Sequence, residues 1–132
     1  MTLDEVQGAY DEALRRVLRD LPTDLVDATI TVDFTSPDNS HYRFSRPDGT
    51  GHARSLQFTV DAEEATVILA DQVQEDVFET VWSACWPLCR WHDHPPVPRL
   101  KDGNAAWVCP RSGDRVARIG ELSGVKSSRH RR

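Results

Sequence analysis

The chain has 132 residues, of which 28% are charged, and its formal net charge is −5. This length corresponds to one domain with an ordinary hydrophobic core, and leaves room for a small appendage. No apolar run approaches the roughly 18 residues of a membrane-spanning helix. The N-terminus opens with acidic residues and lacks an apolar signal core, so we expect a cytoplasmic protein with no membrane contact.

A helix is predicted first, over residues 3–20. Thr2 is suited to cap its start, because Glu5 three residues later completes a capping box. Pro22 is expected to end it. Apolar residues at three- and four-residue steps form one stripe along this helix: Leu3, Val6, Tyr10, Leu14, Val17, Leu18 and Leu21.

Four strands are predicted next. Apolar and polar residues alternate in the first three, and clusters of Pro, Asp, Asn and Gly mark turns between them. The fourth is shorter and more uniformly apolar. These features favour an antiparallel four-stranded meander with one buried and one polar face, formed by residues 28–34, 41–45, 54–60 and 66–70. His41 and His52 are expected to face solvent at its edges.

A second helix is predicted over residues 73–85, and Pro87 is expected to break it. A hairpin of residues 105–109 and 115–119 follows. The expected fold class is therefore α+β, with two helices packed on the meander and a zinc-ribbon-like hairpin after them. The predicted units are an α+β domain over residues 1–86, a Cys/His module over 87–122 and a disordered basic tail over 123–132.

Soft metal ligands and aromatic residues are concentrated in one segment, because all four tryptophans and all three cysteines lie between Trp82 and Cys109. Cys89-x2-His92 has the spacing of a metal-binding knuckle, and His94 adds a third donor. Three cysteines in a reducing compartment favour metal binding or buried thiols over a disulfide framework.

The segment from Cys109 to Gly113 supplies a fourth ligand. It resembles the Cys-Pro-x-Cys-Gly knuckle of zinc ribbons and rubredoxin-like sites, with Ser112 in place of the second cysteine. A degenerate ribbon that folds without metal is the alternative, because this match is incomplete. A closed tetrahedral site, and hence structural rather than catalytic zinc, is predicted from Cys89, His92, His94 and Cys109.

The loop between the two knuckles sets a geometric condition on this site. In an extended segment His92 and His94, two residues apart, point to the same face, so whether both bind one metal with Cys89 and Cys109 depends on how the loop bends. Cys85, one helical turn before Cys89, is the reserve ligand. Its other interpretation is a small buried hydrophobe on the helix face.

The tryptophans are expected to complete the core. Trp82, Trp86 and Trp91 surround the predicted end of the second helix, and Trp107 on the hairpin is expected to pack against them. An exposed aromatic platform for a ligand is the alternative.

The last third of the chain, residues 86–122, resembles a pattern in small uncharacterised proteins of high-GC Gram-positive bacteria. The resemblance implies a shared ribbon-like C-terminal module and brings no known activity. The residues that carry it are Cys89, His92, His94-Pro95, Trp107-Val108-Cys109-Pro110, Gly113, Val116-Ala117 and Ile119-Gly120-Glu121-Leu122.

Signals of enzymatic activity are sparse. No glycine-rich nucleotide loop, serine nucleophile turn or paired-carboxylate site is present in the sequence. One arrangement is compatible with metal-assisted hydrolysis: His92, His94 and Cys109 would hold a metal, and Asp93 or Asp102 would position a water.

Charge divides the chain into an acidic and a basic part. Residues 1–80 carry 17 acidic and 6 basic side chains, whereas residues 81–132 carry 4 acidic and 10 basic ones. Residues 61–79 contain seven acidic residues and no basic one. We therefore expect a non-enzymatic protein-binding or adapter module whose acidic half contacts a basic partner.

The order helix, strands, helix resembles that of small secretion chaperones and similar dimeric adapters, which implies a homodimer. The alternative function is a metal-dependent hydrolase or nucleic-acid-binding protein that uses the basic C-terminal third. In that case the tail would contribute weak contacts to phosphate.

Overall fold

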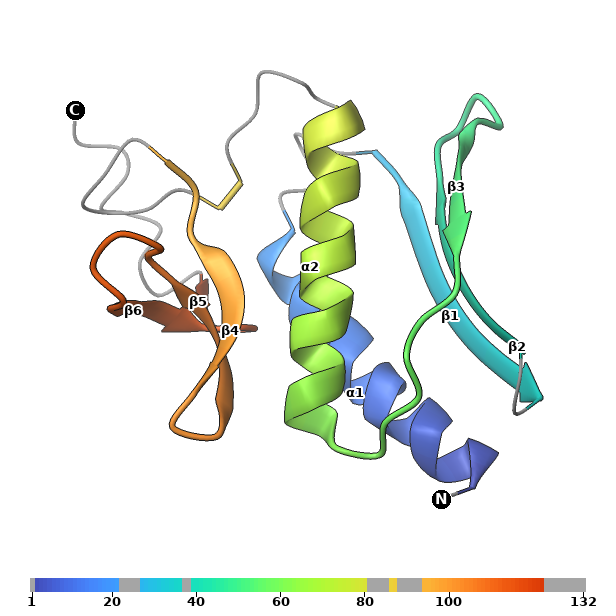
Figure 1. Cartoon of the computed structure of the whole chain (residues 1–132). Coiled ribbons are helices and arrows are strands. Elements are labelled where there is room, and N and C mark those ends of the chain that lie inside the picture. The colour runs from blue at the N-terminus through green and yellow to red at the C-terminus, as the bar shows by residue number, and fades with distance from the viewer. Residues whose placement is uncertain (1, 22–26, 37–38, 81–85, 88–93, 123–132) are drawn as a thin grey trace.

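The computed structural model describes residues 2–21, 27–36, 39–80, 86–87 and 94–122. This part of the chain is α+β, with two helices and two three-stranded antiparallel sheets (Figure 1). The elements are α1 (Leu3–Asp20), β1 (Thr29–Ser36), β2 (Asn39–Ser45), β3 (Gly51–Arg54), α2 (Ala62–Thr80), β4 (Val97–Lys101), β5 (Asn104–Val108) and β6 (Arg115–Arg118). The predicted fold class is confirmed, and the four-stranded meander is wrong.

The helix α2 stands between the two sheets, with α1 packed against it (Figure 1). The first sheet, β1 to β3, contacts α1 through β1, and the second sheet, β4 to β6, contacts α2 through β4 and β5. No helix within the described residues is long and apolar enough to cross a membrane.

The first helix, α1, covers the residues that the sequence predicts. The hydroxyl of Thr2 accepts a hydrogen bond from the Glu5 amide (3.1 Å), and the Glu5 carboxylate accepts one from the Thr2 amide (2.8 Å). The predicted capping box is therefore confirmed. Val6 and Tyr10 from the predicted stripe are fully buried, whereas Leu18 is exposed.

The first sheet has the strand order β1-β2-β3. Ile30 lies opposite Phe44, and Val32 lies opposite Tyr42. These four side chains are buried, whereas Thr31 on the other face is exposed. The alternation in the sequence therefore predicted which face of β1 and β2 is buried.

The third strand, β3, is shorter and earlier than the strand predicted over residues 54–60. After β3 the chain leaves the ladder, and side-chain hydroxyls take the place of strand partners. The Leu56 amide donates to the Ser40 hydroxyl (2.8 Å), and the Gln57 carbonyl accepts from the Tyr10 hydroxyl (2.6 Å). Leu56 is still buried, but Val60, predicted to face inward with it, is exposed and Thr59, predicted to face outward, is buried. Both the predicted alternation and the predicted pairing of this segment are therefore wrong.

The strand predicted over residues 66–70 is also wrong, because these residues lie in α2. Asp61 starts this helix: its carboxylate accepts from the Glu63 amide (2.9 Å), and its carbonyl accepts from the Ala65 amide (2.9 Å). A β-branched run favoured a strand locally, but burial at helical spacing decides the structure. The fully buried residues of α2 include Ala65, Leu69, Ala70, Val73 and Val77. The helix begins at Ala62 rather than at residue 73, and residues 81–85 lie outside the described part.

The second sheet has the order β4-β5-β6 and contains one strand that the sequence analysis missed. Strands β5 and β6 correspond to the two predicted over residues 105–109 and 115–119. The missed strand, β4, carries Pro98 opposite Trp107 and lies at an edge, where a missing amide hydrogen is tolerated. Asp102 has a φ of 55° and Gly103 one of 81°, which is the backbone of a tight hairpin turn between β4 and β5.

A buried carboxylate at the end of α1 fastens the second sheet and the chain after it. Asp20 Oδ2 accepts from Trp107 Nε1 (2.8 Å) and from the Gly120 amide (2.7 Å). Asp20 Oδ1 accepts from the Leu122 amide (3.0 Å). Burial raises the pKa of Asp20, and these three donors oppose that rise.

A second carboxylate, that of Glu63 on α2, also binds the second sheet. Glu63 Oε1 accepts from the Ala105 amide (2.7 Å), and Glu63 Oε2 lies 3.0 Å from Arg16 Nη1. Arg16 Nε also donates to the Ile119 carbonyl (2.9 Å). Burial alone would raise the pKa of Glu63, but the Ala105 amide and the Arg16 guanidinium hold it below its usual value.

Two of the tryptophans pack together in the core. The rings of Trp86 and Trp107 are 5.2 Å apart at an interplanar angle of 72°, and both side chains are buried. The predicted packing of Trp107 is therefore confirmed against Trp86, and these two form no exposed platform. Trp82 and Trp91 lie outside the described residues.

Candidate metal centre and binding groove

The turn that follows β5 has the backbone expected of a metal-binding knuckle. The Ser112 amide donates to Cys109 Sγ (3.5 Å), and the Gly113 amide donates to the Cys109 carbonyl (2.8 Å). Gly113 has a φ of 79°, which glycine adopts without strain. The Ser112 hydroxyl accepts from the Asp114 amide (3.2 Å), so the residue at the lost ligand position stabilises the turn.

One predicted histidine ligand lies beside this sulfur. His94 Nε2 is 4.0 Å from Cys109 Sγ, and Cys109 is fully buried. A tetrahedral zinc with bonds of about 2.3 Å to sulfur and about 2.0 Å to nitrogen sets such atoms about 3.6 Å apart. The structure thus brings together two of the four predicted ligands at a separation close to the one that zinc requires. Cys89 and His92, and the reserve ligand Cys85, lie outside the described residues.

The residue predicted to position a catalytic water lies far from this pair. Asp102 is exposed in the turn that joins β4 to β5, whereas His94 precedes β4 and Cys109 follows β5. The turn and the open end of this hairpin are separated by the length of one strand, about five residues or on the order of 15 Å. Asp102 therefore has no access to a metal held by His94 and Cys109, and Asp93 lies outside the described part of the chain.

An open groove lies over α2. Its volume is about 350 Å³, and it is bounded by the segment after β3 on one side and by β4 on the other. The buried Nε2 of Gln72 has no hydrogen-bond partner among the residues that the structure describes. The residues that line the groove are Ser55, Leu56, Gln57, Val67, Ile68, Asp71, Gln72, Pro98 and Arg99.

Acidic side chains follow the exposed face of α2 past this groove. Asp71, Glu75 and Glu79 are all exposed and lie one helical turn apart. Within the described ranges, neither Asp71 nor Glu75 has an ion-pair partner, whereas Glu79 Oε1 lies 3.3 Å from His52 Nε2. The sequence predicted the acidic surface but not the groove, because the groove depends on how β4 and the segment after β3 flank α2.

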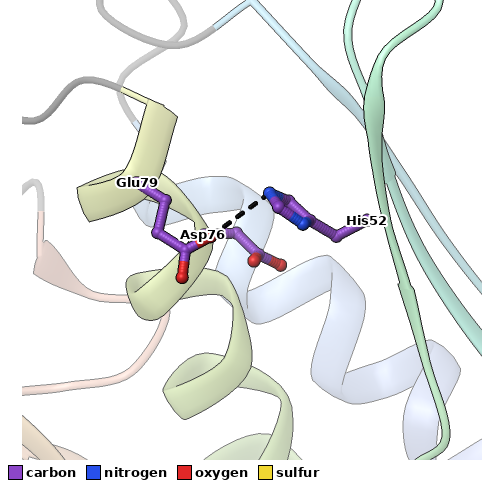
Figure 2. A group of neighbouring side chains, drawn as sticks. All are labelled: His52, Asp76 and Glu79. Atoms are coloured by element: carbon purple, nitrogen blue, oxygen red, sulfur yellow. Dashed lines mark ion pairs between the residues drawn. The ribbon is translucent and has the colours of Figure 1, made fainter.

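A second group of ionisable side chains lies between β3 and α2 (Figure 2). His52, Asp76 and Glu79 each contribute one atom that lies within 4.8 Å of the other two. The expectation that His52 faces solvent is wrong, since it is half-buried and paired with Glu79. Nothing in the sequence pointed to this group, because its members meet only when β3 packs near α2.

Comparison with known proteins gives no match: no protein-family model, no curated protein and no solved structure is similar to this chain.

Proposed function

We propose that this chain is a small cytoplasmic protein-binding module, an adapter, that holds a basic segment of a partner protein in the groove over α2. The observation that carries the proposal is the pair of exposed carboxylates, Asp71 and Glu75, beside an open groove and without an ion-pair partner in the described structure. The resemblance to dimeric adapters adds a homodimer to the proposal, and the mass of the protein in solution tests it.

The charge of α2 supports a basic partner. This helix contains six acidic residues and no lysine or arginine, so its own side chains offer no counter-charge. An exposed ion pair contributes only about 0.2–1 kcal/mol, and salt weakens it. Charge alone therefore gives a weak complex, and a specific partner needs apolar contact as well.

The groove supplies that apolar contact. Val67 and Ile68 from α2 lie half-buried in it, with Leu56 and Pro98 on its two sides. An apolar side chain that enters the groove loses contact with water, which stabilises the complex in proportion to the area buried. The partner segment is thus expected to carry arginine or lysine residues around one apolar anchor.

The C-terminal element has a structural part in this proposal. A zinc ion held by Cys89, His92, His94 and Cys109 would fix the ends of β4 and β5, and β4 is one side of the groove. The amide directed at Cys109 Sγ and the nearby His94 ring support this assignment. Such a closed site contributes folding energy and leaves no open position for chemistry.

Synthetic peptides test the binding proposal. An arginine-rich peptide with one central leucine should bind the full chain with a dissociation constant that weakens between about 50 mM and about 500 mM salt. The same peptide with alanine in place of leucine should bind at least about tenfold more weakly. Fluorescence anisotropy measures both, with a single-stranded oligonucleotide of equal length as the competing ligand.

Charge-matched variants locate the binding surface. The double variant Asp71→Asn with Glu75→Gln should weaken peptide binding, whereas Asp4→Asn with Asp33→Asn removes two exposed charges elsewhere and should not. Equal effects of the two double variants would contradict the groove as the binding site. Tighter binding of the oligonucleotide than of the peptide would favour the nucleic-acid alternative.

Metal content tests the structural zinc. Protein purified without chelator or added metal should contain about one zinc per chain, and Cys109→Ser should lose it. Chain that binds no zinc, even when zinc is offered under reducing conditions, would make this segment a metal-free packing element.

A further inference from the structure

We propose that His52, Asp76 and Glu79 form a binding site for a divalent transition-metal ion, separate from the C-terminal Cys/His cluster. Figure 2 shows the three side chains converging from β3 and α2. Their ligand atoms, one imidazole nitrogen and two carboxylate oxygens, all lie within 4.8 Å of one another. Imidazole with carboxylate is a donor set suited to Mn²⁺ or Fe²⁺.

The state of Asp76 points to a missing ligand. This residue is fully buried, and its Oδ2 accepts a hydrogen bond from the Tyr42 hydroxyl at 2.6 Å. Its other oxygen, Oδ1, is also buried and has no hydrogen-bond partner in the described structure. A buried oxygen without a partner destabilises the folded chain, and more so when it is charged, so a cation at this point would satisfy it.

The Tyr42 hydroxyl fixes the orientation of this carboxylate. The hydroxyl donates to Asp76 Oδ2 at 2.6 Å and leaves Oδ1 as the oxygen available to a cation. Proteins usually orient a metal-binding carboxylate with a hydrogen bond from a residue that does not itself bind the metal.

The other two ligands are placed at the separation that a metal ion requires. His52 Nε2 and Glu79 Oε1 are 3.3 Å apart, and adjacent ligands bonded to one octahedral ion at about 2.2 Å lie about 3.1 Å apart. The side chains of His52 and Glu79 are 29% and 48% exposed. The site is therefore closed on the Asp76 side and open to solvent on the other, which gives an ion a path of entry and room for bound water.

Charge supports the same assignment. Asp76 and Glu79 lie three residues apart on one face of a helix that has no basic residue, so they repel each other. Arg54, two residues beyond His52 on β3, forms no ion pair with any residue in the described ranges. A divalent cation would neutralise both carboxylates at once.

Titration with Mn²⁺ tests the site, because Mn²⁺ binds thiolates poorly and therefore discriminates against the Cys/His cluster. Electron paramagnetic resonance of the full chain should show about one bound Mn²⁺, with nitrogen coupling from one histidine. His52→Ala should weaken the affinity at least about tenfold and remove the nitrogen coupling. Glu79→Gln should weaken it to a similar extent.

Glu75→Gln is the matched control, because it removes an exposed carboxylate one turn earlier on the same helix. This variant should keep the wild-type affinity. Absence of bound Mn²⁺ in the wild-type chain would overturn the proposal, as would equal weakening by Glu75→Gln and Glu79→Gln. The conservative Asp76→Asn variant should show the same loss of Mn²⁺ affinity as Glu79→Gln. Circular dichroism of each variant checks that the fold is intact.

Discussion

The two sheets are fastened to the helices by different forces. The first is held mostly by apolar side chains, with Ile30, Val32 and Phe44 buried on its inner face. One buried hydrogen bond, from Tyr42 to Asp76, joins this sheet to a carboxylate. The second is held also by hydrogen bonds to two carboxylates, Asp20 and Glu63. Apolar burial has no preferred direction, whereas hydrogen bonds to a fixed carboxylate specify position. The polar anchors therefore determine where the second sheet lies, and with it the β4 side of the groove.

The largest expected effect comes from Trp107→Ala. It should lower the free energy of unfolding by about 3–5 kcal/mol, because it opens a cavity and removes a hydrogen-bond donor from Asp20. Phe44→Ala is the matched change in the first sheet, where no buried carboxylate loses a partner, and its cost should fall in the same range. Urea denaturation measures both.

The two variants are distinguished most clearly by how their loss of unfolding free energy depends on pH. The cost of Trp107→Ala should grow as Asp20 ionises, because a charged carboxylate without its donor is less stable than a neutral one. The cost of Phe44→Ala should be nearly constant. If the two costs vary with pH in the same way, the distinction between apolar and polar fastening does not hold.

Asp20→Asn is expected to cost about 1–3 kcal/mol, since one amide oxygen cannot accept all three hydrogen bonds. The pKa of Asp20 is raised above 3.8 in the folded chain, so the folded state binds this proton more tightly than the unfolded state does. The contribution of Asp20 to stability is therefore greatest at low pH and declines as pH rises from that value through the folded pKa. Urea denaturation of both proteins across this range should show the decline in the wild-type chain only. If the stability of Asp20→Asn declined with pH as that of the wild-type chain does, the pKa of Asp20 would not be the cause.

Glu63→Gln should have a smaller effect, about 1 kcal/mol near neutral pH, because Glu63 is partly exposed. The pKa of Glu63 is lowered below 4.5, so its contribution has the opposite sign of pH dependence. It is present above that value and is lost as pH falls through the folded pKa. Thermal unfolding measured against pH tests this. The control is Glu75→Gln, which removes an exposed carboxylate that forms no ion pair within the described residues and should change stability by less than about 0.5 kcal/mol.

The elements that were predicted correctly are those whose buried residues follow a regular spacing within one continuous segment of the sequence. The first helix has a capping box and a regular stripe, and β1 and β2 alternate, so the bounds of α1 and the buried faces of β1 and β2 followed from the chain itself. The two strands extend further toward their shared turn than the predicted 28–34 and 41–45. The strand predicted over residues 66–70 failed because its β-branched residues favour a strand, while packing on α1 favours a helix. The strand β4 was missed because Pro98 argues against a strand unless that strand lies at an edge.

The candidate sites show the same limit. The knuckle around Cys109 was visible because its residues are adjacent in sequence and its glycine has a defined role. The acidic surface was visible as a count of charges. The groove and the His52–Asp76–Glu79 group were not, because each depends on contacts between segments that the sequence reading did not place together.

The measurement that tests the binding account most directly is a nuclear magnetic resonance titration of the isotope-labelled chain with the arginine-rich leucine peptide. If a basic segment occupies the groove, the largest amide shifts should cluster there, at Ile68, Asp71, Gln72 and Glu75, and they should saturate together. Shifts confined to the polar face of the first sheet, or to the basic residues of β6, would show that the groove is not the binding surface.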